Sequence, residues 1–275
     1  TYKKFFKGSG FPKFKSKRGR QSFTAYQWIE IYHNEIKFFK NNIKFRTSKW
    51  LSQKLEINKI KRVTFTKDLE GKYWATLLID EKENLELPKL EKSIGIDLGI
   101  KELIITSDGE FFENKNYLKK EYYKLRTLQR KFAKTKKNGK NREKLRVKIA
   151  KKHNKISNQR IHYYHQIVNK LIRENQTICI ESLKIKEMVK NKLLSRSISD
   201  ISWGLLVEML EYKCDWYGRE LIKINTYFPS SKRCFNCGNI KKELKLSERI
   251  YKCDICNFSE DRDLNAAYNI LNEGL

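Results

Sequence analysis

The alternation of hydrophobic and polar residues separates a β-rich front part of the chain from a mixed α/β remainder. Short runs of β-branched and aromatic residues with partial alternation occur at 23–33, 60–68 and 72–80, which is typical of strands that bury one face. The stretch 69–72, which contains a glycine, predicts the turn of a β-hairpin between the last two runs. We therefore expect a small, mostly antiparallel sheet or barrel that ends near Pro88.

The hydrophobic period changes after this front part. Residues 93–98 form an apolar run that predicts a buried strand, the first of two or three predicted strands. About 65 helix-prone residues follow these strands. Apolar residues at spacings of three and four between 118 and 132 predict an amphipathic helix. A loop at 136–140 then separates this helix from a second one that runs to about residue 173.

The C-terminal part predicts further strands and helices around a short insertion. We expect a strand at 176–182, a helix at 199–217, a strand at 220–228 and a final helix from about Arg262. From residue 93 onward the predicted order is therefore β-β-β-α-β-α-β-α, which indicates an α/β fold.

Composition changes this picture mainly through charge. The 275 residues include 39% hydrophobic and 12% aromatic side chains, which excludes collagen-like and wholly disordered chains. Repulsion within a chain of formal net charge +28 would oppose folding to a compact state unless the chain normally binds a polyanion. We therefore expect a nucleic-acid partner. A basic protein of the membrane surface is the alternative, but the sequence contains no apolar run of about 18 residues and no lipidation motif.

Two segments concentrate the basic residues. Residues 2–20 combine Lys and Arg with four Phe that can stack on bases, and residues 119–155 carry seventeen Lys or Arg against two Glu. The alternatives are a disordered basic tail and a solvated helix pair, although the helices lack the acids that would form i,i+4 ion pairs. We predict nucleic-acid contacts by Lys13, Lys15, Lys17, Arg18, Arg20, Lys131, Lys134 and Lys137.

Four of the six cysteines form two CxxC pairs, at 234–237 and 253–256, with fifteen residues between them. This spacing is typical of a closed tetrahedral Zn²⁺ site with a structural role, and it favours metal ligands in a reducing cytoplasm over disulfides. Gly238 and Asn257 follow the two pairs and suit left-handed turns. The predicted zinc ligands are Cys234, Cys237, Cys253 and Cys256.

Three acidic residues occupy positions that suit a second metal site. Asp97 lies within one apolar strand and Glu181 ends another, where an unpaired carboxylate would be costly. Asp263 opens the final helix, and Asp261 is better placed to cap it. Because Mg²⁺ prefers carboxylate oxygens, two strand acids and one helix acid predict a magnesium site. Taken singly, each acid could equally be a turn or helix-start residue.

Several strings resemble the split RuvC nuclease and zinc ribbon of the TnpB family, the transposon-encoded RNA-guided nucleases related to type V CRISPR effectors. The resemblance runs from about Ser93 to the end, and a weaker one near the start concerns the family's oligonucleotide-binding wedge barrel. The strings are GIDLGIKEL (95–103), CIESLKIKEM (179–188), the segment 229–258 from PSSK to ICNF, SEDRDLNAAYNI (259–270) and KFKSKRGRQSFT (13–24).

The resemblance implies an α/β RNase H-like (RuvC) nuclease core with an inserted zinc ribbon, preceded by a small β-rich wedge or oligonucleotide-binding barrel. The implied domains are a basic arm and partial wedge barrel at 1–88, the nuclease at 89–228 with a basic helical hairpin at about 116–174, the zinc ribbon at 229–259 and a final RuvC helix at 260–275.

The resemblance also implies an activity: guide-directed cutting of DNA at two Mg²⁺ ions. Asp97, Glu181 and Asp263 take the catalytic and Mg²⁺-binding positions, and Arg262 and Asn265 are supporting residues in the same C-terminal motif. The implied cofactors are structural Zn²⁺ and catalytic Mg²⁺. The implied partners are a guide RNA from the transposon end, target DNA and a transposase encoded at the same locus, in the cytoplasm of a bacterium or archaeon and associated with its nucleoid.

Three alternatives accompany this interpretation. The chain begins at Thr1 with only about 90 residues before the nuclease, so a truncated remnant without the family's recognition region is one of them. A catalytically silent RNA-guided DNA-binding regulator is another, which the retention of all three acids disfavours. The third is a guide-independent, structure-selective nuclease.

We also expect Tyr227 and Phe228, beside the zinc ribbon, to stack on bases of single-stranded DNA.

Overall fold

Contacts divide the protein into two compact units in the computed structural model, and each unit is described by itself. Residues 1–83 and 128–151 form unit 1, and residues 84–127 and 152–275 form unit 2. The structure describes residues 6, 8, 11, 21–26, 29–32, 35–49, 51–53, 59–80, 85–191, 194–245 and 248–275.

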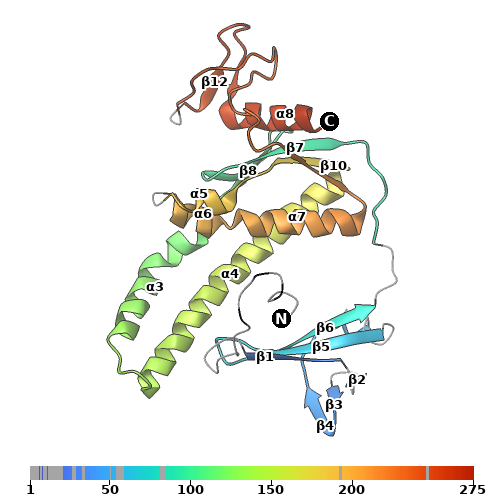
Figure 1. Ribbon diagram of the computed structural model, residues 1–275, viewed down its shortest axis with the longest axis vertical. Coiled ribbons are helices and arrows are strands. Elements are labelled where there is room, and N and C mark those ends of the chain that lie inside the picture. Colours follow the sequence, from blue (N-terminus) through green and yellow to red (C-terminus); the bar gives the residue numbers. More distant parts are fainter. Residues whose placement is uncertain are drawn as a thin grey trace. The chain divides into compact units, whose positions relative to one another are not determined.

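Unit 1 contains two three-stranded antiparallel sheets (Figure 1). Phe38 makes ring contacts with Phe23 and Phe65, while Ile36 and Val63 are buried. These contacts pack the second sheet onto one face of the first, as the predicted half-buried strands require. The first sheet has the order β1 (Gln21–Ala25), β5 (Lys59–Lys67), β6 (Tyr73–Asp80), and the second has β2 (Ile29–Tyr32), β3 (Glu35–Phe38), β4 (Asn41–Lys44).

The predicted hairpin turn between β5 and β6 is confirmed. Asp68 accepts hydrogen bonds at Oδ1 from the backbone N–H groups of Glu70 and Lys72, at 2.8 and 2.9 Å. Its other oxygen accepts from Trp74 Nε1 at 2.8 Å, and this bond is the main reason that the pKa of Asp68 is lowered. Gly71 has φ of 87°, a left-handed conformation that favours glycine.

Unit 2 is built on one mixed five-stranded sheet with the order β11-β10-β7-β8-β9. The central strand β7 pairs in parallel with β10, which pairs in parallel with β11, whereas β8 pairs antiparallel with both β7 and β9. The strands are β7 (Ser93–Leu98), β8 (Glu102–Thr106), β9 (Phe111–Glu113), β10 (Thr177–Glu181) and β11 (Glu220–Ile224).

Helices cover both faces of this sheet (Figure 1). On one face, Ile96 and Ile180 belong to a buried cluster that includes Val168 and Leu206 from helices α4 and α7. On the other face lies α8, and Ile270 packs there against Cys179. The helices from residue 117 onward are α3 (Tyr117–Ala133), α4 (Lys140–Glu174), α5 (Ile185–Met188), α6 (Ser195–Ile201), α7 (Trp203–Tyr217) and α8 (Arg262–Gly274).

Two predicted boundaries are wrong, each for a local reason. The helix predicted at 199–217 is broken at Ser202, whose φ of 55° ends α6 before α7 begins. The strand predicted to reach residue 228 ends at Ile224, because Asn225 starts a turn in which its carbonyl accepts from the N–H of Phe228 at 3.1 Å. In the described residues no helix is both long and apolar enough to span a bilayer.

An ion pair between α4 and α6, on the face of the sheet opposite α8, is expected to contribute to stability. Arg160 donates to Asp200 at 2.7 Å, and the two side chains are only 14% and 11% exposed. Replacing Asp200 with Ala leaves a poorly hydrated guanidinium unpaired, so we expect the free energy of unfolding to fall by about 3 kcal/mol in urea titrations. Glu211→Ala removes the exposed pair with Lys223 and should cost less than about 1 kcal/mol. Equal losses in the two variants would contradict this account.

Candidate metal centres

The first two predicted acids lie side by side on neighbouring strands. The register pairs Ile180 of β10 with Ile96 of β7 in parallel, so Glu181 stands next to Asp97 at the same edge of the sheet. Alternate residues of a strand share a face, and Gly95 and Cys179, two positions earlier, face α8. The two carboxylates therefore belong to the α8 face of the sheet.

A glycine in β7 allows α8 to bring the third acid to this place. A Cβ atom on Gly95 would lie 2.2 Å from the carbonyl oxygen of Ala267, so the helix backbone rests directly on the strand. Asp263 lies one turn before Ala267 at the start of α8. As expected, Asp261 caps this helix, and its Oδ1 accepts from the N–H groups of Asp263 and Leu264 at 2.9 and 3.1 Å.

Electrostatics indicates that the three acids share one environment. Burial is the largest cause that raises the pKa of Asp97 to about 8, and the negative charges of Glu181 and Asp263 raise it further. Arg262 acts in the opposite direction. Burial also raises the pKa of Glu181. A hard divalent cation would compensate the charge of carboxylates that lie this close together, and it prefers carboxylate oxygens as ligands, so this donor set suits Mg²⁺.

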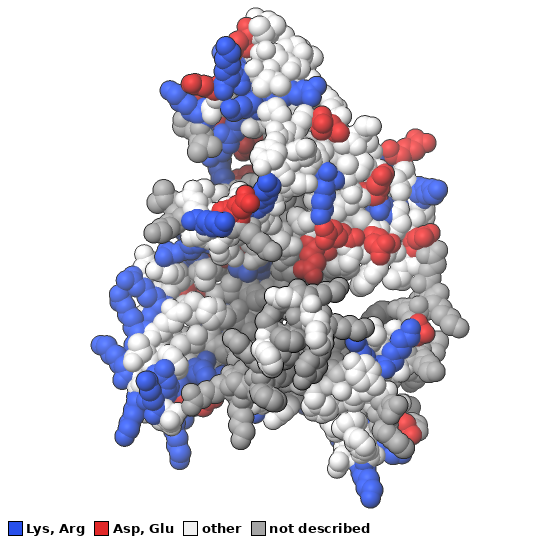
Figure 2. Space-filling model, viewed as in Figure 1, with Lys and Arg blue, Asp and Glu red and all other residues white. Residues whose placement is uncertain are grey.

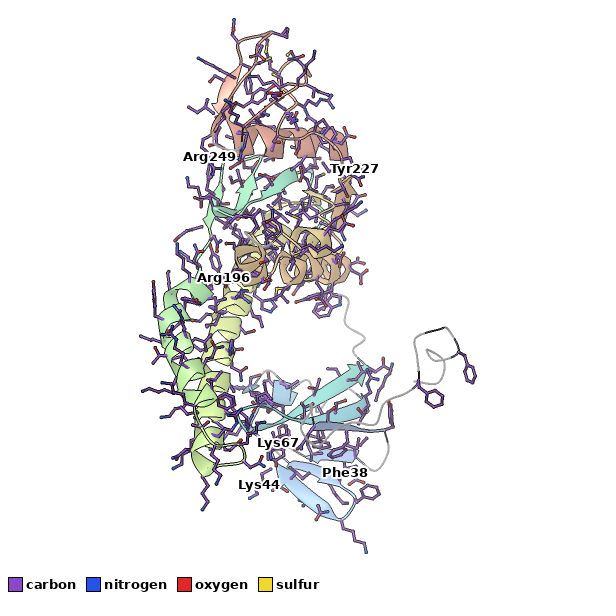
Figure 3. All side chains as sticks on the ribbon, turned by 60° about the vertical axis from the view of Figure 1, so that its left-hand side comes forward. Phe38, Lys44, Lys67, Arg196, Tyr227 and Arg249 are labelled. Atoms are coloured by element: carbon purple, nitrogen blue, oxygen red, sulfur yellow. The ribbon has the colours of Figure 1, made fainter. Side chains whose placement is uncertain are left out.

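Two arginines hold Asp263. Arg262, predicted as a supporting residue, donates from Nε and Nη2 to Asp263 Oδ1 at 3.0 and 2.9 Å. Arg249, which the sequence interpretation missed, lies with Nη1 3.5 Å from Asp263 Oδ2 and is labelled in Figure 3. It comes from the insertion, just before β12 (Ile250–Lys252), and no local pattern distinguishes it from the many other basic residues there.

Asn265 does not contact the acids and instead joins α8 to the insertion. The side chain is fully buried, its Nδ2 donates to the carbonyl of Arg233 at 2.8 Å and its Oδ1 accepts from the N–H of Phe235 at 3.1 Å. Phe235 lies inside the first CxxC pair, so this asparagine fixes the first cysteine turn against the helix that carries Asp263.

The four predicted cysteine ligands meet at one point. One ligand atom from each lies within 4.8 Å of the others, a separation that suits a tetrahedral Zn²⁺ site. Gly238 and Asn257 have φ of 74° and 58°, which confirms the two left-handed turns. A hydrogen bond from the side chain of Asn236 is the main cause that lowers the pKa of Cys256 to about 6, whereas burial raises the pKa of Cys234. A thiolate is the form that binds zinc. The cluster members are Cys234, Cys237, Cys253 and Cys256.

This arrangement predicts one zinc ion per chain, measurable by elemental analysis of the purified protein. Cys253→Ser should lower the zinc content to near zero, because it removes a thiolate from a closed site. Cys214→Ala is the control, since Cys214 is a buried core thiol in α7 outside the cluster. Unchanged zinc content in Cys253→Ser would contradict the assignment.

Of the basic residues predicted to contact nucleic acid, the structure describes the three at the end of α3 and in the loop after it. Lys131, Lys134 and Lys137 are exposed where α3 ends and the loop before α4 begins, and Figure 2 shows blue side chains gathered over α3. Arg142 stabilises this loop, because it donates to the carbonyl of Phe132 at 3.0 Å and stacks on that ring at 3.9 Å. The arm residues Lys13, Lys15, Lys17, Arg18 and Arg20 lie outside the described residues.

Of the two aromatic residues expected to stack on bases, only Tyr227 is well exposed. Tyr227, labelled in Figure 3, is 78% exposed. Lys184 Nζ donates to its hydroxyl at 2.8 Å. Phe228 instead packs on the cluster formed by Cys179, Ile224 and Ile270. Both residues follow β11, near the edge of the sheet where Glu181 ends β10.

Sequence and structure comparisons identify relatives of this chain. Residues 76–192 match the family described as "Probable transposase", and residues 203–270 match the one described as "Cas12f1-like, TNB domain". A "Putative RNA-guided DNA endonuclease" of Streptomyces pristinaespiralis is 36% identical over 98% of this chain and 67% of its own length. A second protein so named, InsQ of Escherichia coli K12, is 28% identical over 100% of this chain and 71% of its own length.

Among solved structures, a Cas12f1 complex with single guide RNA and target DNA matches with a TM-score of 0.63. The match covers 98% of this chain and 68% of that one at 17% identity, so it concerns the fold. The protein therefore has a Cas12f1-like fold. Because it is 36% identical to the Streptomyces protein over nearly its whole length, the chain belongs to the TnpB family of transposon-associated RNA-guided DNA endonucleases.

Proposed function

We propose that this protein is an RNA-guided DNA endonuclease with a RuvC-like core that hydrolyses phosphodiester bonds at the three-acid site. The observation that carries the proposal is the convergence of Asp97, Glu181 and Asp263 from three separate chain segments on one face of the sheet. Family membership supplies the class of substrate, since the relatives are named for DNA cleavage under RNA guidance.

The three carboxylates would hold Mg²⁺ through their oxygens. Two Mg²⁺ ions held there would supply the activation of a water molecule and the stabilisation of the leaving 3′ oxygen, so that the products would carry 5′-phosphate ends. Arg249 and Arg262 are the cations nearest to Asp263 and are suited to contact the scissile phosphate once the carboxylate turns to the metal. The exposed ring of Tyr227 offers a surface on which a base of the entering strand can stack.

Sequence specificity in this proposal comes from pairing between a guide RNA and the target strand. The basic side chains around Lys131, Lys134 and Lys137 would bind the phosphate backbone, which carries no sequence information itself. The front sheets of unit 1 would serve as the wedge barrel, and the zinc ribbon would guide single-stranded DNA towards the acids. The transposon end would encode the guide, and a transposase would be encoded at the same locus.

RNA that co-purifies with the protein tests the proposal. We expect expression with the native flanking locus to yield one defined RNA species, and the complex to cut DNA matching that RNA in Mg²⁺ but not in EDTA. A defined RNA without cutting would favour a regulator. Cutting by protein that carries no RNA would favour a structure-selective nuclease, and either result would contradict the proposal.

A further inference from the structure

A serine outside the three acids contacts one of them. The hydroxyl of Ser230 donates a hydrogen bond to Oε1 of Glu181. Ser230 is only 6% exposed and lies in the turn after β11, so this hydroxyl faces the end of β10 rather than solvent. The bond opposes the rise that burial causes in the pKa of Glu181.

The backbone around Ser230 is fixed by α8. Asn269, which is 2% exposed, donates from Nδ2 to the carbonyl of Ser230 at 2.9 Å and to that of Arg233 at 2.7 Å. The N–H of Ser230 donates to the carbonyl of Phe228 at 2.9 Å. The helix that brings Asp263 to the site therefore also sets the position of the serine that contacts Glu181.

Two of the three acids thus accept a hydrogen bond from a neighbouring side chain. The hydroxyl of Ser230 donates to Glu181, and the guanidinium of Arg262 donates to Asp263. Glu181 has the longest side chain of the three and loses the most rotamer freedom when it binds a metal. Its bond from Ser230 engages one carboxylate oxygen, Oε1. Hydrogen bonds of this kind orient metal ligands, and their loss typically costs about 10–100-fold in metal affinity or activity.

We propose that Ser230 is a positioning residue for Glu181: its hydroxyl holds the carboxylate in the orientation that binds the divalent cation. This inference rests on the proposed function, because it assigns metal binding to Glu181. Ser230 itself contacts neither metal nor substrate in this account. Its effect therefore falls on the concentration of metal that the site needs.

The test compares Ser230→Ala with Thr226→Val. Thr226 lies on the same turn and donates to the carbonyl of Ser182 at 2.6 Å, so its replacement also removes a hydroxyl but leaves Glu181 untouched. In the complex with guide RNA, Ser230→Ala should raise the Mg²⁺ concentration for half-maximal cleavage about 10-fold. Thr226→Val should leave it unchanged, and Ser230→Thr, which keeps the hydroxyl, should restore the wild-type value.

Metal binding to the full chain without substrate gives a second readout. In Mn²⁺ titrations followed by electron paramagnetic resonance, Asp97→Asn should remove the site, and Ser230→Ala should weaken it about 10-fold. If the wild-type complex does not cut DNA but these shifts occur, the proposed function fails and the positioning role stands. Unchanged metal dependence in Ser230→Ala, or a lower cleavage rate with an unchanged half-maximal concentration, would overturn the role of Ser230.

Discussion

Asp97→Asn is expected to lower the rate of guide-directed DNA cleavage by about 1,000-fold or more, because it removes the central carboxylate of the metal site. Folding should not suffer. Burial and two neighbouring acids raise the pKa of Asp97 to about 8. In the metal-free protein the substitution therefore replaces a carboxyl group whose charged form is unfavourable with a neutral amide of the same shape. We therefore expect thermal unfolding at or above the wild-type temperature and unchanged binding of guide RNA.

Asp108→Asn is the matched control for this prediction. Asp108 lies between β8 and β9 of the same sheet, but its side chain is 42% exposed and pairs with Lys92. The substitution removes the same charge away from the α8 face, so cleavage should stay within about twofold of the wild type. An Asp97→Asn protein that still cuts would remove this acid from the mechanism.

The second large effect is expected from Gly95→Ala, which adds a single methyl group. The added Cβ would lie 2.2 Å from the carbonyl oxygen of Ala267 and 2.7 Å from the N–H nitrogen of Leu271. Both are backbone atoms of α8, so the helix as a whole has to move away from β7. We expect the free energy of unfolding to fall by about 3 kcal/mol and cleavage to be lost, because Asp263 moves with the helix.

Gly204→Ala is the control that shows whether the loss expected for Gly95→Ala comes from the contact with α8 or from any replacement of glycine by alanine in this unit. A Cβ at Gly204 would lie 3.9 Å from Ile185 Cδ1, an ordinary contact, and the residue is inside helix α7. We expect this variant to be neutral or more stable by about 0.5–1 kcal/mol in urea titrations, with full cleavage activity. If Gly95→Ala matched it in stability and activity, the close packing of α8 on β7 would not be required for the site.

The sequence allowed prediction of the three acids because each is a charged residue at a position where the hydrophobic pattern predicts a buried strand or the start of a helix. Asp97 interrupts one apolar strand, Glu181 ends another, and Asp263 opens an amphipathic helix behind its cap. The cluster of four cysteines was predictable for a similar reason, since paired CxxC turns have few other uses. The α/β order and most element positions followed from the hydrophobic period alone.

The residues that orient these groups could not be predicted in the same way. Ser230 and Arg249 lie in irregular segments without periodicity, and they reach Glu181 and Asp263 only through tertiary contacts. The helix break at Ser202 has a similar origin, because a serine within an apolar stripe gives no local signal for a left-handed backbone. Local patterns thus specify where the acids lie, and long-range packing specifies how they are held.

Exchange of the guide sequence tests whether the bound RNA selects the DNA that the protein cuts. The protein is purified with its RNA carrying either of two unrelated guide segments, and each complex is incubated in Mg²⁺ with a mixture of two plasmids, one matching each guide. The account predicts that each complex cuts only its matching plasmid, that EDTA stops the reaction and that Asp97→Asn abolishes it. Cutting of both plasmids by one complex, or of neither by wild-type protein, would contradict it.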